Sequence, residues 1–220
     1  MGEIILRTAD VAAIDLWDSG SASYQLYSLT LSDVSMIMPG QFMPLGTTAR
    51  EQQSDITTLI DGGIEYIVGL DNIERVEMAG FMYNLWCQTD INLPLCTSLS
   101  SYAFAMFGGY PLSGEPTSER MKTLTLSVPA LTSWNMAALY NTKFSTIYFR
   151  DLQTIPSGAF DYVGEYLTDI YLPMSLMLAH PGGRVVNAHS LRFHVPGSLV
   201  SVYSTATGWS NESLITWVSI

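Results

Sequence analysis

A constant period of about 23 residues in the second half of the chain constrains the fold more than any other feature of this sequence. Four short segments at this spacing share one pattern: a polar residue, an apolar residue, any residue and a second apolar residue. They are residues 123–126, 146–149, 169–172 and 192–195. Pro173 and Pro196 keep the same step. A fixed period of 20–50 residues is typical of proteins built from stacked repeats.

Less regular copies of the unit precede these four. The apolar positions of residues 147–160 recur without a gap at Leu29, Leu31, Val34, Ile37 and Phe42, then at Val68, Leu70, Ile73, Val76 and Phe81, and again at Ile91, Leu93, Cys96, Leu99 and Phe104. Two insertions near residues 43–64 and 108–118 interrupt the period. Both are rich in Gly, Pro, Ser, Thr and acidic residues, so we expect loops at one edge of the stack, where binding residues often lie.

The alternating triplet in each unit is the pattern of a short strand with one buried face. A single unit of this length is too small to bury that face alone. Stacked units would align their triplets into a parallel sheet, and the second apolar group of each unit would close the core from the other side. The terminal units must differ, because an end unit leaves one core face open to water.

Several phrases of the sequence carry a resemblance to a known family: LQTIPSGAF at 152–160, LTDIYLP at 167–173, TSLSSYAF at 97–104 and VPGSLVSVYSTATGW at 195–209. These phrases resemble the BspA-like leucine-rich repeat, the treponemal type. The resemblance covers about residues 26–210, and it is stronger from residue 121 onward. Its most specific part is the closing phrase, in which Val-Pro leads to a spaced Tyr, Ala and Trp.

The repeat and the resemblance together predict an α/β class leucine-rich repeat solenoid, right-handed and β-rich with little helix, with a concave parallel β-sheet. We expect one structural domain overall. Residues 1–25 would form an N-terminal cap or a docking segment. Residues 26–196 would form the repeats, each about 23 residues long, with their two insertions, and residues 197–220 a C-terminal cap.

The two ends have sequences suited to covering a core. Residues 4–6 are expected to form a capping strand, and the following segment a short helix. Tyr203 and Trp209 are interpreted as structural residues that close the other end. Trp217 and its apolar neighbours would add a last strand.

Composition and charge exclude some partners. Nine Lys and Arg against 20 Asp and Glu give a net charge of -11, so nucleic acid and anionic membrane surfaces are disfavoured. No run approaches the roughly 18 apolar residues of a membrane span, and the opening residues lack the pattern of a signal peptide. The two cysteines, Cys87 and Cys96, are expected to be buried thiols.

Reactive constellations are scarce. The three histidines, His180, His189 and His194, follow no zinc-binding pattern, and no Gly-x-Ser-x-Gly nucleophile motif occurs. We therefore expect no enzyme activity, no catalytic residues, no cofactor and no metal.

The repeat also predicts a binding surface. The middle residue of each triplet points away from the core, so residues 125, 148, 171 and 194 should stand side by side, preceded by Thr30, Gly69 and Asn92. Aromatic side chains beside Arg and Asp are typical of interfaces, although cross-strand aromatics can also merely stabilise a sheet. The candidate binding residues on the concave face are Thr125, Tyr148, Arg150, Tyr171, Arg192 and His194. The insertions near 43–64 and 108–118 are the competing site.

These features favour a non-catalytic protein-binding or adhesion module. The resemblance implies a surface or secreted protein with a protein or glycan partner. The alternative is a structural or accessory component of a phage particle or similar assembly, consistent with the missing signal sequence and the non-repeat N-terminus. Localisation therefore stays open between the cell surface, a virion and the cell interior.

Overall fold

The computed structural model describes residues 2–7, 25–42, 63–82, 84, 87–108, 123–135, 137–160, 163, 166–174, 177–183, 185–186 and 189–220. These residues form a β-rich structure with parallel sheets and little helix, which confirms that part of the prediction. The expected N-terminal helix and most of both insertions lie outside the described residues.

The strands belong to three sheets. The first sheet has the order β1 Gly2–Arg7, β2 Gln25–Ser32 and β4 Gly63–Val68. The second has six strands, in the order β13 Ile215–Ser219, β12 Leu191–Val195, β11 Asp169–Tyr171, β10 Phe144–Tyr148, β8 Leu124–Ser127 and β6 Ile91–Asn92. The third has four short strands, in the order β3 Met36–Ile37, β5 Arg75–Val76, β7 Ser98–Leu99 and β9 Ser133–Trp134.

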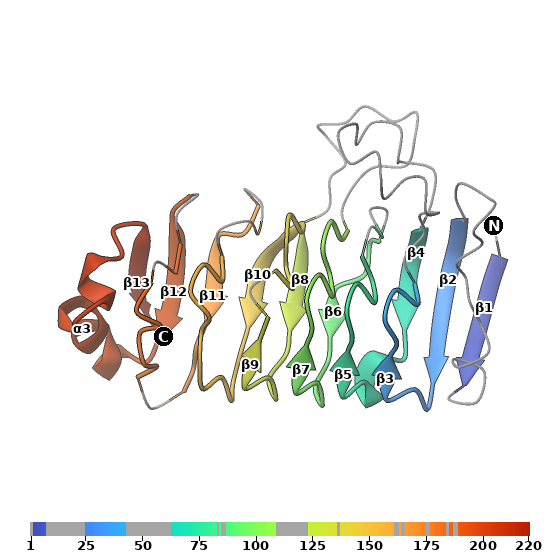
Figure 1. Ribbon diagram of the computed structural model, residues 1–220, viewed down its shortest axis with the longest axis horizontal. Coiled ribbons are helices and arrows are strands. Elements are labelled where there is room, and N and C mark those ends of the chain that lie inside the picture. Colours follow the sequence, from blue (N-terminus) through green and yellow to red (C-terminus); the bar gives the residue numbers. More distant parts are fainter. Residues whose placement is uncertain are drawn as a thin grey trace.

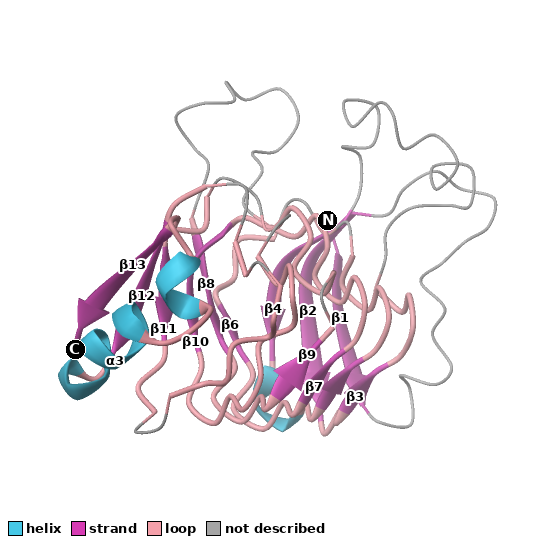
Figure 2. Cartoon of the chain, turned by 60° about the vertical axis from the view of Figure 1, so that its left-hand side comes forward, coloured by secondary structure: helices cyan, strands magenta, loops and turns pink. Residues whose placement is uncertain are grey.

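All pairings between these strands are parallel, and their order in space follows their order in the chain. The strands accordingly succeed one another along the long axis of the molecule, from β1 near one end to β13 near the other (Figure 1). The short strands β3, β7 and β9 form a row separate from the strands of the larger sheet (Figure 2). The helical elements of the described residues are η2 Leu70–Asn72, α3 Gly197–Thr205 and η3 Trp209–Asn211.

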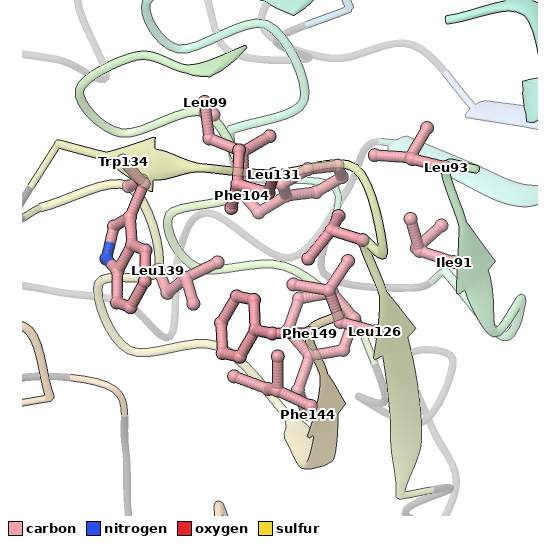
Figure 3. Packing of buried hydrophobic residues seen from close by; sticks show 14 of the residues in the cluster. Ile91, Leu93, Leu99, Phe104, Leu126, Leu131, Trp134, Leu139, Phe144 and Phe149 are labelled. Atoms are coloured by element: carbon pink, nitrogen blue, oxygen red, sulfur yellow. The ribbon is translucent and has the colours of Figure 1, made fainter. Parts of the chain in front are cut away.

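Alternation of side chains in the strands builds the core. Leu124 and Leu126 of β8 are buried, whereas Thr125 and Ser127 between and after them are partly exposed. Leucine, isoleucine and phenylalanine side chains from successive strands and turns fill the interior between the two rows of strands (Figure 3). Both cysteines are buried, as expected, and neither forms a disulfide.

Three successive turns repeat the same backbone geometry. Gly40, Ala79 and Tyr102 have positive φ values of 65°, 57° and 59°, and the N–H of each donates to a carbonyl of the next turn. Two residues after each of them stands a buried phenylalanine, and the rings of Phe42, Phe81 and Phe104 stack at centroid distances of 5.4 and 5.3 Å. The aromatic column is thus a direct consequence of the repeated turn.

The register of the six-stranded sheet matches the constant step only in part. Ile147 pairs with Ile170, and Ile170 pairs with Phe193, as the constant step predicts. Leu126, however, pairs with Ile147, whereas the constant step would pair it with Phe149. The stretch from β8 to β10 is therefore two residues shorter than the period, and a register irregularity occurs between Phe144 and Thr146.

A second register prediction was wrong by one residue. Thr30 pairs with Val68 and not with Gly69. Gly69 ends the strand with φ 81°, and a Cβ atom there would lie 1.9 Å from the carbonyl oxygen of Leu31. Only glycine can bring the backbone this close, so Gly69 serves the turn into η2 and presents no side chain on the sheet.

The C-terminal end is closed by aromatic residues. Tyr203 of α3 and Trp209 of η3 are fully buried, which confirms their structural interpretation. The backbone N–H of Leu178 donates to the Tyr203 hydroxyl at 2.8 Å, and Trp209 Nε1 donates to the Leu178 carbonyl at 3.0 Å. The predicted last strand is also present, since β13 pairs with β12 and its Trp217 stacks on Tyr203 at 4.3 Å.

Candidate binding face

Three rings stand in register on the outward side of the six-stranded sheet. Tyr148 of β10 pairs with Tyr171 of β11, which pairs with His194 of β12. The Tyr148 and Tyr171 rings are 4.6 Å apart with an interplanar angle of 21°, and the Tyr171 and His194 rings are 4.1 Å apart at 5°. Together with Asp169 and Arg192 in the neighbouring column, these residues form what we call the aromatic face.

The strand pattern explains why the rings point outward. In β12, Leu191, Phe193 and Val195 are buried, so Arg192 and His194 project to the other side. The spacing of neighbouring strands is about 4.8 Å, close to the distance at which flat rings stack. A register that places three rings side by side therefore produces a continuous stack.

Asp169 connects the polar side chains of the aromatic face. Its Oδ1 lies 2.6 Å from His194 Nε2, and its Oδ2 accepts hydrogen bonds from Arg192 Nη2 at 2.6 Å and from the Thr168 hydroxyl at 2.7 Å. Burial raises the pKa of Asp169, but the hydrogen bonds from His194, Thr168 and Arg192 outweigh this effect and leave the pKa below its ordinary value. The carboxylate thus holds the imidazole and the guanidinium in fixed positions.

Arg150 lies just beyond the end of β10. Its guanidinium makes two hydrogen bonds to the Asp151 carboxylate, at 3.0 and 2.8 Å, and these bonds lower the pKa of Asp151. Next to this ion pair is a pocket of about 450 Å³, lined by residues 150–153 together with Met174, Met177 and Leu178. Arg150 therefore belongs to the rim of the pocket.

The structure places five of the six predicted binding residues on the outward side of the sheet. Tyr148, Tyr171, Arg192 and His194 lie on one face as expected, and Asn92 also belongs to the Tyr148 column, through its pairing with Ser127. Thr125 lies on the same outward side but not in the ring column: it pairs with Thr146 in the neighbouring column of Asp169 and Arg192, because β8 is displaced by two residues relative to the period. Its backbone N–H donates to Asp90 Oδ1 at 2.8 Å.

Asp169 and Ser127 are missing from the predicted set of binding residues. Asp169 lies in the column beside the rings, and the signal that could have identified it is its position diagonal to His194 on the adjacent strand. Ser127 takes the place of Thr125 in the ring column, because the stretch between β8 and β10 is two residues shorter than the period. No feature of the sequence predicts this shortening.

Two broader features of the described residues bear on the site. No helix among them is long and apolar enough to cross a membrane. They contain no group of three or more His, Cys, Asp or Glu side chains arranged to hold a metal ion. The competing binding segments lie mostly outside the described residues, at 43–62 and 109–118.

Comparison of the sequence with models of protein families and with curated proteins finds no match.

Proposed function

We propose that this protein is a non-catalytic protein-binding module, built as a right-handed leucine-rich repeat solenoid of the BspA-like type, and that it binds its partner through the aromatic face. The single observation that carries the proposal is the ordered row of three stacked rings on the outward side of the sheet, with paired charges alongside.

Two regularities support the solenoid. The order of strands in each sheet follows the chain, as it does when each unit packs only on its neighbours. The turns at Gly40, Ala79 and Tyr102 repeat one hydrogen-bonding arrangement at successive positions, and each is followed by a stacked phenylalanine.

The composition and rigidity of the aromatic face support binding. Tyr and Arg are enriched at the energetically important positions of protein interfaces, because they offer a large contact area with a polar tip. Stacking holds the rings in place before a partner arrives, so little side-chain entropy remains to be lost on binding. The Asp169 carboxylate bonds both Arg192 and His194, an arrangement suited to recognition by shape and charge.

The test compares two pairs of exposed tyrosines. The double variant Tyr148→Ala/Tyr171→Ala removes two rings of the aromatic face. The matched control Tyr102→Ala/Tyr140→Ala removes two rings that contact each other edge-on at 6.3 Å in turns after β7 and β9. Wild type and both variants are used for affinity capture from the native source, with quantitative mass spectrometry, followed by affinity measurement on the captured partner.

We expect the face variant to lose a partner that the control retains, with an affinity at least about 30-fold weaker, corresponding to about 2 kcal/mol. Thermal unfolding of both variants checks that each remains folded. Equal retention by the face variant, combined with loss on deletion of residues 108–118, would assign binding to the insertion and contradict the proposal.

A further inference from the structure

The stack of rings is open at its Tyr148 end, whereas at the other end His194 pairs with Val218 of β13. Tyr171 is covered on both faces, by Tyr148 and by His194. Tyr148 has a ring on one side only: on its other side, the next residue in register is Ser127, followed by Asn92. Among the residues that the structure describes, no aromatic ring stacks on this second face, and Tyr148 is 41% exposed.

The position next to Tyr148 has the dimensions of one more flat group. The rings on neighbouring strands stack 4.6 and 4.1 Å apart, close to the strand spacing of about 4.8 Å. A planar group standing over Ser127 would therefore stack on Tyr148 in the same way. The side chain of Ser127 is too short to cover the ring, while its hydroxyl and the amide of Asn92 offer hydrogen-bonding groups to an occupant.

The surrounding charges favour a cationic occupant. Arg150 is bonded to Asp151, and Arg192 to Asp169, so both of these arginines already have a carboxylate partner. Asp90 lies two residues before Asn92 and therefore on the same side of the sheet. It is exposed, and its Oδ1 accepts a hydrogen bond from the Thr125 N–H. The whole protein carries a net charge of -11, which attracts cationic partners and repels anionic ones.

We propose that the partner inserts an arginine side chain at this open end, with its guanidinium stacked on Tyr148 over Ser127 and directed toward Asp90. Guanidinium is flat, always charged and suited to stacking on an aromatic face, whereas the compact ammonium of lysine is not flat. This inference rests on the proposed binding function and gives it a chemical class of partner: a protein with an exposed arginine.

The test uses labelled hexa-arginine and hexa-lysine peptides, whose charges are equal, and measures binding by fluorescence anisotropy at physiological salt. We expect wild type to bind hexa-arginine about fivefold more tightly than hexa-lysine, the size of one exposed cation–π contact. The lysine peptide reports the general attraction of a polycation to an acidic protein.

Three variants locate the effect. Ser127→Leu covers the open face of Tyr148 with a side chain that has no flat ring, and Tyr148→Leu removes the stacking surface; both should abolish the preference for arginine. Tyr102→Leu, at a tyrosine outside the aromatic face, should retain it. Thermal unfolding of the three variants, compared with wild type, separates lost binding from lost folding.

Equal affinity of wild type for the two peptides, or a preference that persists in Ser127→Leu, would overturn the inference. A titration with methyl glucoside that perturbs NMR signals of residues around Ser127 while neither peptide does so would assign the open end to a glycan and overturn it equally. In either case the proposed function stands if the Tyr148→Ala/Tyr171→Ala variant still loses its captured partner, so the two failures are distinguishable.

Discussion

At the scale of single residues, Asp169 has the greatest influence on the aromatic face. One carboxylate oxygen faces the imidazole of His194, and the other faces the guanidinium of Arg192 and the hydroxyl of Thr168. The side chain of Asp169 is only 13% exposed, so its bonds are better shielded than those of an ordinary surface ion pair. Removing its charge should therefore disturb the ring stack as well as the ion pair.

Asp169 should make the stability of the protein dependent on acid pH. Its pKa in the folded protein lies below the ordinary value, so its stabilising contribution is present above about pH 4 and is lost as the pH falls through the folded pKa. We expect Asp169→Asn to lower the free energy of unfolding by about 1 kcal/mol at pH 7. The difference from wild type should shrink toward zero in strong acid, as measured by urea denaturation across this range.

The control for this prediction is Asp151→Asn. It removes the same charge from a fully exposed pair with Arg150, and its effect on unfolding should be small at every pH. A difference between Asp169→Asn and wild type that stays constant on acidification would contradict the assigned role of the carboxylate.

At the scale of elements, the strands are short and the turns between them determine the register. Gly69 shows this most directly, because its positive φ and its approach to the Leu31 carbonyl allow β4 to pass into η2 beside the preceding unit. A side chain at this point would push the two units apart. The turn is therefore as important to the stack as the buried strand residues.

Two glycines with similar backbone angles separate the two reasons for a glycine, its backbone conformation and the lack of space for a Cβ atom. Gly69 and Gly182 have φ values of 81° and 85°, but a Cβ at Gly182 would meet no atom within 4 Å. Gly182→Ala should cost only the conformational strain, about 1 kcal/mol, whereas Gly69→Ala adds the clash and should cost about 3 kcal/mol or more. Chemical denaturation of the two variants measures both, and equal losses would show that the close approach to Leu31 is unimportant.

The strand registers also show which features of the fold and the site could be predicted from the sequence. The constant step correctly aligned Tyr148, Tyr171 and His194, because the stretches between their strands keep one length. It misplaced Thr125 and Gly69, because a shortened stretch or a left-handed turn changes the register without changing the apolar pattern. The bonds of Asp169 could not be predicted, since they depend on how side chains meet diagonally between strands.

At the scale of the whole molecule, each strand contacts its neighbours in the stack, and the ends require separate protection. At the C-terminus this protection comes from Tyr203 and Trp209, which bond both backbone groups of Leu178, and from the Trp217 ring stacked on Tyr203. Glu212 adds hydrogen bonds to the Val185 N–H at 2.9 Å and to His180 at 3.1 Å. The cap is thus attached to the preceding unit by polar as well as apolar contacts.

Loss of the cap should weaken the whole stack. Trp209→Ala removes a fully buried ring and its bond to Leu178, and we expect the free energy of unfolding to fall by about 3–5 kcal/mol. Val202→Ala changes an exposed residue of α3 and should remain within about 0.5 kcal/mol of wild type. Calorimetry of both variants tests the cap, and a Trp209→Ala protein as stable as wild type would exclude this role.

The constant step between β10, β11 and β12 also determines how this chain could change in length. Residues 149–171 span one complete step, so a tandem duplication of this segment would place a further tyrosine between Tyr171 and His194 while leaving the phase of every later strand unchanged. A one-residue insertion within a strand would instead turn its buried side chains outward. Duplication or deletion of this segment would therefore change the number of stacked rings by one at a time, and the length of the aromatic face with it.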